Sequence, residues 1–180
     1  MALILIKEDG TGKMDANSYA TAADGDAYHE GHLYASPWTS ATLANKDAAL
    51  VMATRLINVE FQFNGFRKTS TQALQWPREK CPDRDKARNG GFVSFGPYVD
   101  NDKVPKAVIE ATCEMARELL ITDRTAAPLG EGLTLQRNTD QSEQIFNKRD
   151  RRSVISCLAQ TMLWRFGAPI RKAGIVLTRA

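Results

Sequence analysis

The residues best suited to bind a charged ligand form a short basic run near the C-terminal end of the chain. Lys148, Arg149, Arg151 and Arg152 lie close together and are interrupted only by Asp150. Lysine and arginine clusters bind phosphate oxygens and can hold a nucleic-acid backbone. The run lies where we expect a helix to begin, and cations there oppose the helix dipole. The run therefore predicts contact with phosphates, DNA included, or with an acidic neighbouring subunit.

Other residues could in principle do metal or phosphate chemistry, but their spacing argues against it. His29 and His32 could share a metal with Asp26 or Cys81, yet two histidines without a third assured ligand are more often surface groups. Residues 8–12 lack the alternating oxygen ligands of a calcium loop, and residues 10–14 lack the glycine spacing and hydroxyl of a phosphate-binding loop. We expect no enzyme, no metal and no cofactor, and keep a hydrolase using the two histidines as a remote alternative.

The composition is that of an ordinary folded domain. The chain has 180 residues, of which 43% are hydrophobic and 25% charged, so it is large enough to bury a core. We predict one domain over residues 1–180. The apolar start, residues 1–6, is too short for a membrane span or a signal peptide. The three cysteines, an odd number without a CxxC pair, favour free thiols in a reducing compartment.

The charge is distributed unevenly along the chain. Residues 148–180 carry eight basic side chains and one acidic one, which leaves residues 1–147 with a net formal charge of −4. An acidic body and a basic end favour head-to-tail contacts between copies, or contact with phosphates.

Four stretches show the apolar periodicity of amphipathic helices. They predict helices over residues 20–32, 46–63, 105–121 and 150–166. Asn17 or Ser18 would cap the first, Asp102 the third, and Gly65 would end the second in a left-handed conformation. The second and third helices should form the packed core. The fold class is therefore mainly α, a compact bundle of about four helices.

The remaining segments predict small β elements and irregular chain. Residues 3–6 read as a short N-terminal strand, and residues 79–103 as a long irregular loop that wraps a surface or contacts a neighbour. Residues 123–149 contain a hairpin or arm, and residues 168–180 form an extended tail. That tail could add a strand to a partner's sheet. Its candidate portal or neighbour contacts are Ile170, Arg171, Lys172, Ile175, Val176 and Leu177.

The aromatic residues divide into candidates for base stacking and candidates for the core. Trp38, Tyr98, Phe92 and Phe95 could stack with bases, although nothing in the sequence places them beside the basic run. Trp76 and Trp164 are flanked by apolar helix formers, which predicts that both are buried.

Several motifs in order resemble a known family. They are residues 8–12, 15–19 and 24–29, Trp38, the helix from Ala48 to Gly65, residues 72–78, and residues 104–116. Over roughly residues 4–122 the chain resembles the tailed-phage family labelled "DnaT-like single-stranded-DNA-binding". After residue 122 it departs from the family pattern.

The resemblance implies a head–tail connector adaptor of the virion neck. Such a protein would form a homo-oligomeric ring, commonly of twelve copies, docked on the portal protein and joined to tail or neck proteins, with genomic DNA passing through. It would be assembled in the host cytoplasm and would not contact a membrane. The alternative is a single-stranded-DNA-binding replication accessory protein. In either case Lys148, Arg149, Arg151 and Arg152 are the candidate DNA or subunit contacts.

Overall fold

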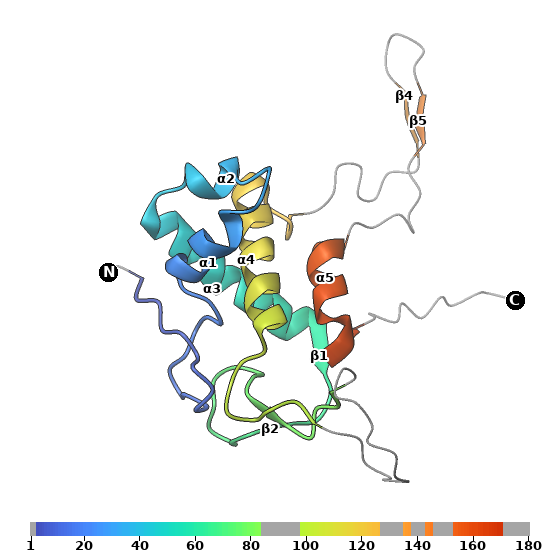
Figure 1. Ribbon diagram of the computed structural model, residues 1–180. Coiled ribbons are helices and arrows are strands. Elements are labelled where there is room, and N and C mark those ends of the chain that lie inside the picture. Colours follow the sequence, from blue (N-terminus) through green and yellow to red (C-terminus); the bar gives the residue numbers. More distant parts are fainter. Residues whose placement is uncertain (1–2, 84–97, 127–134, 138–142, 146–152, 171–180) are drawn as a thin grey trace, which may run out of the picture.

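Two long helices, α3 (Leu43–Glu60) and α4 (Lys106–Ile121), pack against each other at the centre of the molecule (Figure 1). The computed structural model describes residues 3–83, 98–126, 135–137, 143–145 and 153–170. Between the two helices the core holds Leu50, Ile57, Val108 and Met115, all fully buried. The prediction that these two stretches form the core is confirmed, and so is the mainly α class of the fold.

The boundaries of α3 differ from the predicted 46–63 because of its cap and its partner strand. Thr42 accepts a hydrogen bond from the Asn45 N–H, so the helix begins at Leu43. At its other end the chain turns into strand β1 (Phe61–Phe63), which pairs antiparallel with β6 (Gly167–Pro169). The predicted helical end at Phe63 is wrong. Residues 61–63 are alternately buried and exposed, as expected for a strand, and pairing with β6 stabilises this conformation more than a further turn of helix would.

Gly65 does have a left-handed backbone, with φ of 76°, but it does not end a helix. It lies in the turn that leads from β1 to β2 (Phe66–Arg67), which pairs with β3 (Arg78–Glu79). A Cβ added to Gly65 would lie 2.2 Å from the carbonyl oxygen of Glu79. Glycine is therefore required there both for its conformation and for the close approach of β3.

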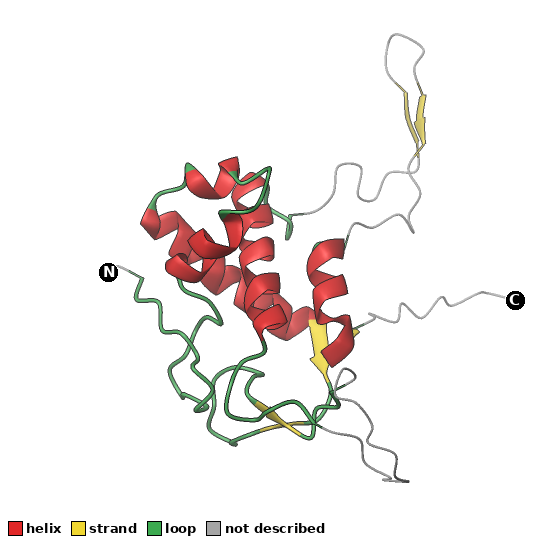
Figure 2. Ribbon diagram, viewed as in Figure 1, coloured by secondary structure: helices red, strands yellow, loops and turns green. Residues whose placement is uncertain are grey.

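Helices α1 (Ala22–His29) and α2 (Ser36–Thr39) cover one end of the central pair (Figure 2). The first helix is shorter than predicted, because Thr21 and Asp24 form a capping box at its start. The predicted cap Asn17 has another role: its side chain accepts from the Ile6 N–H and donates to the Ile4 carbonyl. Residues 3–6 are thus held by a side chain, and the predicted strand is absent apart from a single bridge between Lys7 and Ser18.

Helix α4 confirms the predicted third helix, with one correction at its start. Pro105 is the N-cap residue and no side chain caps the helix, so the predicted role of Asp102 is wrong. Pro105 occupies the N-cap position, and its side chain has no oxygen that could accept from the N–H groups of the first turn.

The last helix is much shorter than the predicted 150–166. Helix α5 covers Cys157–Leu163, and the 3₁₀ turn η1 continues over Trp164–Phe166. Ser156 caps α5 by accepting from the Ala159 N–H, which fixes the start after residues 153–156. Residues 150–152 lie outside the described part of the chain.

The β pieces outside the core are small. Strands β4 (Leu135–Arg137) and β5 (Glu143–Ile145) pair antiparallel, which confirms the predicted hairpin in residues 123–149. The ends of the 79–103 loop meet where Pro82 bridges Tyr98, while residues 84–97 lie outside the described part. Among the described residues no helix combines the length and apolarity needed to cross a membrane.

Candidate functional site

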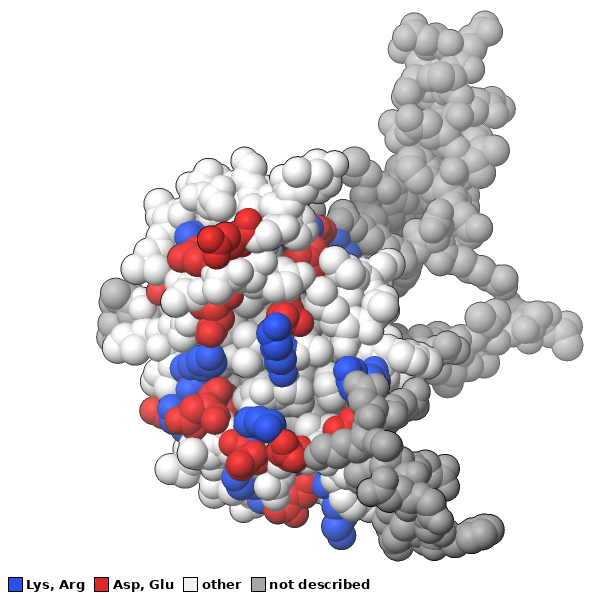
Figure 3. All heavy atoms as spheres, in the orientation of Figure 1, with Lys and Arg blue, Asp and Glu red and all other residues white. Residues whose placement is uncertain are grey.

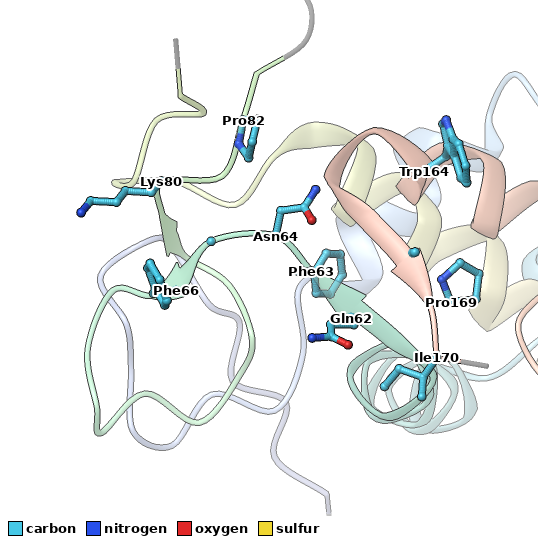
Figure 4. Close-up of a pocket in the computed structure, with 11 residues that line it drawn as sticks. Gln62, Phe63, Asn64, Phe66, Lys80, Pro82, Trp164, Pro169 and Ile170 are labelled. Carbon is cyan, nitrogen blue, oxygen red and sulfur yellow. The ribbon is translucent and has the colours of Figure 1, made fainter. Parts of the chain in front are cut away.

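A groove of about 1060 Å³ lies between the β1–β6 ribbon and the β2–β3 ribbon. Figure 4 shows Phe66 and Lys80 on one side of it, and Trp164, Pro169 and Ile170 on the other. The groove therefore joins the middle of the chain to its C-terminal end. It is lined by Gln62, Phe63, Asn64, Gly65, Phe66, Lys80, Pro82, Trp164, Ala168, Pro169 and Ile170.

The two sides of the groove each present a large exposed aromatic ring. Trp164 is 61% exposed and Phe66 is 68% exposed. Trp164 also lines a second concavity of about 550 Å³ on its other side, together with Cys157, Gln160 and Thr161. Its indole thus stands between two hollows. Exposed rings in this position are flat apolar surfaces on which planar ligands can stack.

The polar groups around the groove are amides and one cation. Gln62 and Asn64 are exposed, and Lys80 has no acidic side chain within ion-pair distance in the part of the chain described here. Lys80 has a φ of 55°, a left-handed conformation that a side chain rarely adopts. The groove therefore combines apolar rings with hydrogen-bonding groups, and a positive charge lies at its edge.

Elsewhere on the described surface, many basic residues are paired with acids. Lys7, Lys13 and Lys46 make ion pairs with Asp24, Asp9 and Asp26, respectively. Figure 3 shows positive and negative groups interspersed on the face it presents. Neutralised pairs of this kind attract phosphates weakly. Lys80, unpaired with any described acid, lies on the Phe66 side of the groove, and Figure 4 shows its side chain extending away from Trp164.

A buried arginine holds the floor of the groove in place. Arg78 is only 7% exposed, and its guanidinium donates to the carbonyl oxygens of Phe63, Asn64 and Gly65. It also donates to the carbonyl and side-chain oxygens of Gln75. Burial lowers the pKa of this guanidinium, yet arginine stays charged. The charge stabilises the tight β1–β2 turn by satisfying carbonyl groups that would otherwise be unpaired.

An aromatic cluster lies beneath the groove and connects its two sides. The indole of Trp76 packs edge to face against Phe63 and Phe166, with ring centroids 5.6 and 5.5 Å apart. Trp76 is fully buried, as predicted. The backbone supports the same connection, because the Asn64 N–H donates to the Phe166 carbonyl oxygen at 2.8 Å. These contacts fix the position of η1, and so of Trp164.

The close approach of β1 and β6 depends on a second glycine. A Cβ on Gly167 would lie 2.1 Å from the Gln62 carbonyl oxygen. Gly167 follows η1 directly. Its absent side chain also lets β6 lie against β1, and Ile170 then donates its N–H to the Glu60 carbonyl oxygen.

Only one of the predicted contact residues falls at this groove. Ile170 lines it, and the described chain ends there. The others lie outside the described residues: Lys148, Arg149, Arg151, Arg152, Arg171, Lys172, Ile175, Val176 and Leu177. In the sequence, these residues flank the segment 153–170, which carries Trp164.

The predicted stacking aromatics are largely replaced by others. Trp38 is fully buried, with its indole N–H bonded to Asp26, so it cannot stack on a ligand. Phe92 and Phe95 lie outside the described residues. Trp164 was predicted to be buried and is exposed, because α5 ends one residue before it. Phe66 was not singled out from the sequence.

The residues considered as metal or phosphate ligands make contacts that stabilise the fold. His29 is buried, with Nε2 3.2 Å from the Cys113 carbonyl oxygen, while Cys81 packs near Phe166. No group of three metal-ligating side chains exists among the described residues. The Glu8 carboxylate accepts from the N–H groups of Gly10, Gly12 and Lys13, so residues 8–13 form a closed turn.

Comparison with known families matches most of the chain. The model of the family described as "Putative DnaT-like ssDNA binding protein" matches residues 1–143. The chain belongs to this family. The match extends beyond residue 122, where the resemblance was expected to end. It includes β1, β2 and β3 on one side of the groove and ends before α5. No curated protein and no solved structure matches the chain.

The family description corrects the predicted role. It names single-stranded DNA binding, so the prediction of a head–tail connector adaptor is wrong, and the alternative of a DNA-binding protein agrees better. No finding supports a portal, tail proteins or a twelve-membered ring as partners, whereas contact with DNA is compatible with the family. The predicted virion location rested on the same role, and nothing in the described residues bears on it.

Proposed function

We propose that the protein binds single-stranded DNA along the groove by stacking unpaired bases on Trp164 and Phe66. The observation that carries the proposal is the pair of exposed rings on opposite sides of one groove (Figure 4). Single-stranded nucleic acid is commonly held by aromatic side chains that stack on its bases, combined with cations that follow its backbone. The family's description supports the same class of ligand.

The charges near the groove suit a phosphate backbone. Lys80 lies on the Phe66 side. In the sequence, Arg171 and Lys172 follow Ile170 directly, and the run 148–152 precedes Ser153. Phosphate contacts of this kind confer affinity without sequence preference and weaken as salt rises. The proposed role is binding rather than catalysis, as an accessory to DNA replication.

The test is a titration of a fluorescently labelled oligothymidylate, followed by anisotropy at low and at moderate salt. Wild-type protein should bind, and its affinity should fall steeply as salt is raised. Trp164→Ala and Phe66→Ala should each weaken binding by about 5- to 150-fold, the equivalent of losing one stacked base at about 1–3 kcal/mol.

Tyr34→Ala provides a matched control. Tyr34 is also a strongly exposed aromatic residue, 71% accessible, but it does not line the groove. Its replacement should leave the affinity unchanged. An absence of binding at low salt would overturn the proposal, and so would equal losses in all three variants, since the groove would then have no special part.

A further inference from the structure

A smaller cavity of about 310 Å³ opens beside the groove, and three of the residues that line it, Asn58, Gln62 and Gln75, carry amide side chains. It shares Gln62, Phe63, Gly65 and Ile170 with the groove. Its own lining adds three polar residues and one aromatic: Asn58, Gln75, Arg78 and Phe61. Because the two hollows share a wall, a strand lying in the groove could place one base in the cavity.

The orientation of the Asn58 amide is fixed by Tyr19. The Tyr19 hydroxyl oxygen accepts hydrogen bonds from the N–H groups of Gln75 and Trp76. Its own proton is therefore directed to Asn58 Oδ1, 2.5 Å away. Burial raises the pKa of Tyr19, so the hydroxyl keeps that proton. With its oxygen held by Tyr19, Asn58 presents its NH₂ group as a donor of fixed orientation.

Arg78 fixes the orientation of the Gln75 amide in the same way, by holding its oxygen. Gln75 Oε1 accepts from the Arg78 guanidinium at 2.8 Å, which leaves the Nε2 group of Gln75 as a donor. Within the described chain, neither this group nor Asn58 Nδ2 donates to another residue. Gln62 lies at the boundary with the groove. The cavity is thus rich in hydrogen-bond donors whose directions are set by buried partners.

We infer that this cavity is a nucleobase subsite that selects bases carrying keto oxygens, thymine or guanine, over bases carrying amino groups at the same position. The inference rests on the proposed binding of single-stranded DNA. A keto oxygen accepts from the fixed amide NH₂ groups, whereas an amino group in its place sets donor against donor. Donors that a bound base covers without pairing carry a desolvation cost, so the preference should be about tenfold.

The same donors are less suited to a phosphate. The five N–H groups of Arg78 are already used by carbonyl and amide oxygens. The cavity therefore presents neutral amide donors and no free cationic N–H. Neutral donors match a neutral carbonyl oxygen, whereas phosphate binding usually relies on charged donors.

The experiment compares oligothymidylate with oligodeoxycytidylate of the same length, by anisotropy and at one salt concentration. These two strands differ in the keto or amino group at position 4 of the ring, with the accompanying change at N3, and in the methyl group that thymine carries at position 5. The two variants below alter the amide donors and leave the methyl contact unchanged, so they separate the two contributions. Wild-type protein should favour thymidylate by about tenfold. Gln75→Glu and Asn58→Asp keep the oxygen that accepts from Arg78 or Tyr19 and replace the NH₂ donor with an acceptor. Each variant should abolish or reverse the preference.

Asn64→Asp is the matched control for the added negative charge. Asn64 lines the groove but not the cavity, so this variant should weaken binding of both strands equally and keep their ratio. Thermal melting of each variant verifies that it is folded.

The outcomes separate this inference from the proposed function. Wild-type protein that binds both strands with equal affinity would overturn the nucleobase subsite and leave the proposed function standing. If Gln75→Glu lowered the affinity for both strands equally, and by more than Asn64→Asp does, the cavity would bind a phosphate. That result would also overturn the nucleobase subsite. Failure to bind either strand would instead contradict the proposed function itself.

Discussion

Arg78 Nη2 donates a hydrogen bond of 2.6 Å to the carbonyl oxygen of Gly65, which joins the start of β3 to the turn between β1 and β2. The same guanidinium reaches the carbonyl oxygens on both preceding residues, Asn64 and Phe63. One side chain therefore determines the shape of the groove floor from beneath.

Replacing Arg78 with methionine should destabilise the protein by about 3 kcal/mol or more, because several buried carbonyl groups lose their donor. Urea denaturation followed by circular dichroism measures the change. Arg55→Met is the control, since Arg55 lies exposed on α3, and it should change the free energy of unfolding by less than about 0.5 kcal/mol. Equal effects of the two substitutions would show that the hydrogen bonds of Arg78 contribute little.

Gly65→Ala should cost at least about 1–2 kcal/mol, because the left-handed backbone disfavours a side chain and the new Cβ would meet the backbone of β3. Gly31→Ala is the matched control, because a Cβ there meets nothing within 4 Å. It should be close to neutral. The difference in melting temperature between the two variants is the measurement, and two equal values would contradict the assignment.

Stability should fall as the pH is lowered below the ordinary histidine pKa of about 6.5, through His29. Burial lowers the pKa of His29, while a hydrogen bond to the Cys113 carbonyl works in the opposite direction. Its Nδ1 atom is buried without a hydrogen-bond partner among the described residues. The unfolded chain therefore takes up a proton that the folded protein resists, so acid favours unfolding.

His29→Phe should flatten this part of the stability profile. Melting temperatures measured from about pH 8 to about pH 5, where only histidine among ordinary side chains titrates, provide the comparison. The melting temperature of the variant should rise relative to that of the wild-type protein as the pH falls. A gap that stays constant across this range would show that His29 does not titrate differently on folding.

Trp164 should account for nearly all the tryptophan fluorescence that a soluble quencher can reach. Trp38 and Trp76 are fully buried, whereas Trp164 is 61% exposed. Iodide should therefore quench part of the emission of the wild-type protein, and this quenchable part should be absent in Trp164→Phe. Strong residual quenching in that variant would contradict the burial of the other two indoles.

The sequence predicted the central helices well because their apolar stripes are long. Residues such as Leu50, Ile57, Val108 and Met115 repeat at helical spacing over several turns, and the pattern survives small errors at the ends. Short elements were less predictable. The chain at Phe61–Phe63 continues an apolar helical pattern, and only its pairing with β6, far away in the sequence, makes it a strand.

The groove could not be predicted because its members come from distant segments. Phe66 and Trp164 line the same hollow only after β1 has paired with β6. The one available signal was Gly167, which ends the helical region directly after Trp164 and so places that indole near an exposed end. The core prediction for Trp164 relied on apolar neighbours, Leu163 and Phe166, which are themselves buried.

Arg124 contacts both ends of the chain that leaves α4 and returns to α5. It forms an ion pair with Glu118 of α4 and donates to the carbonyl oxygens of Ser153 and Val154. The segment between residues 125 and 152 therefore departs from and rejoins the domain at one point. Arg124 thereby fixes the place where the chain leaves α4 relative to the place where it enters α5.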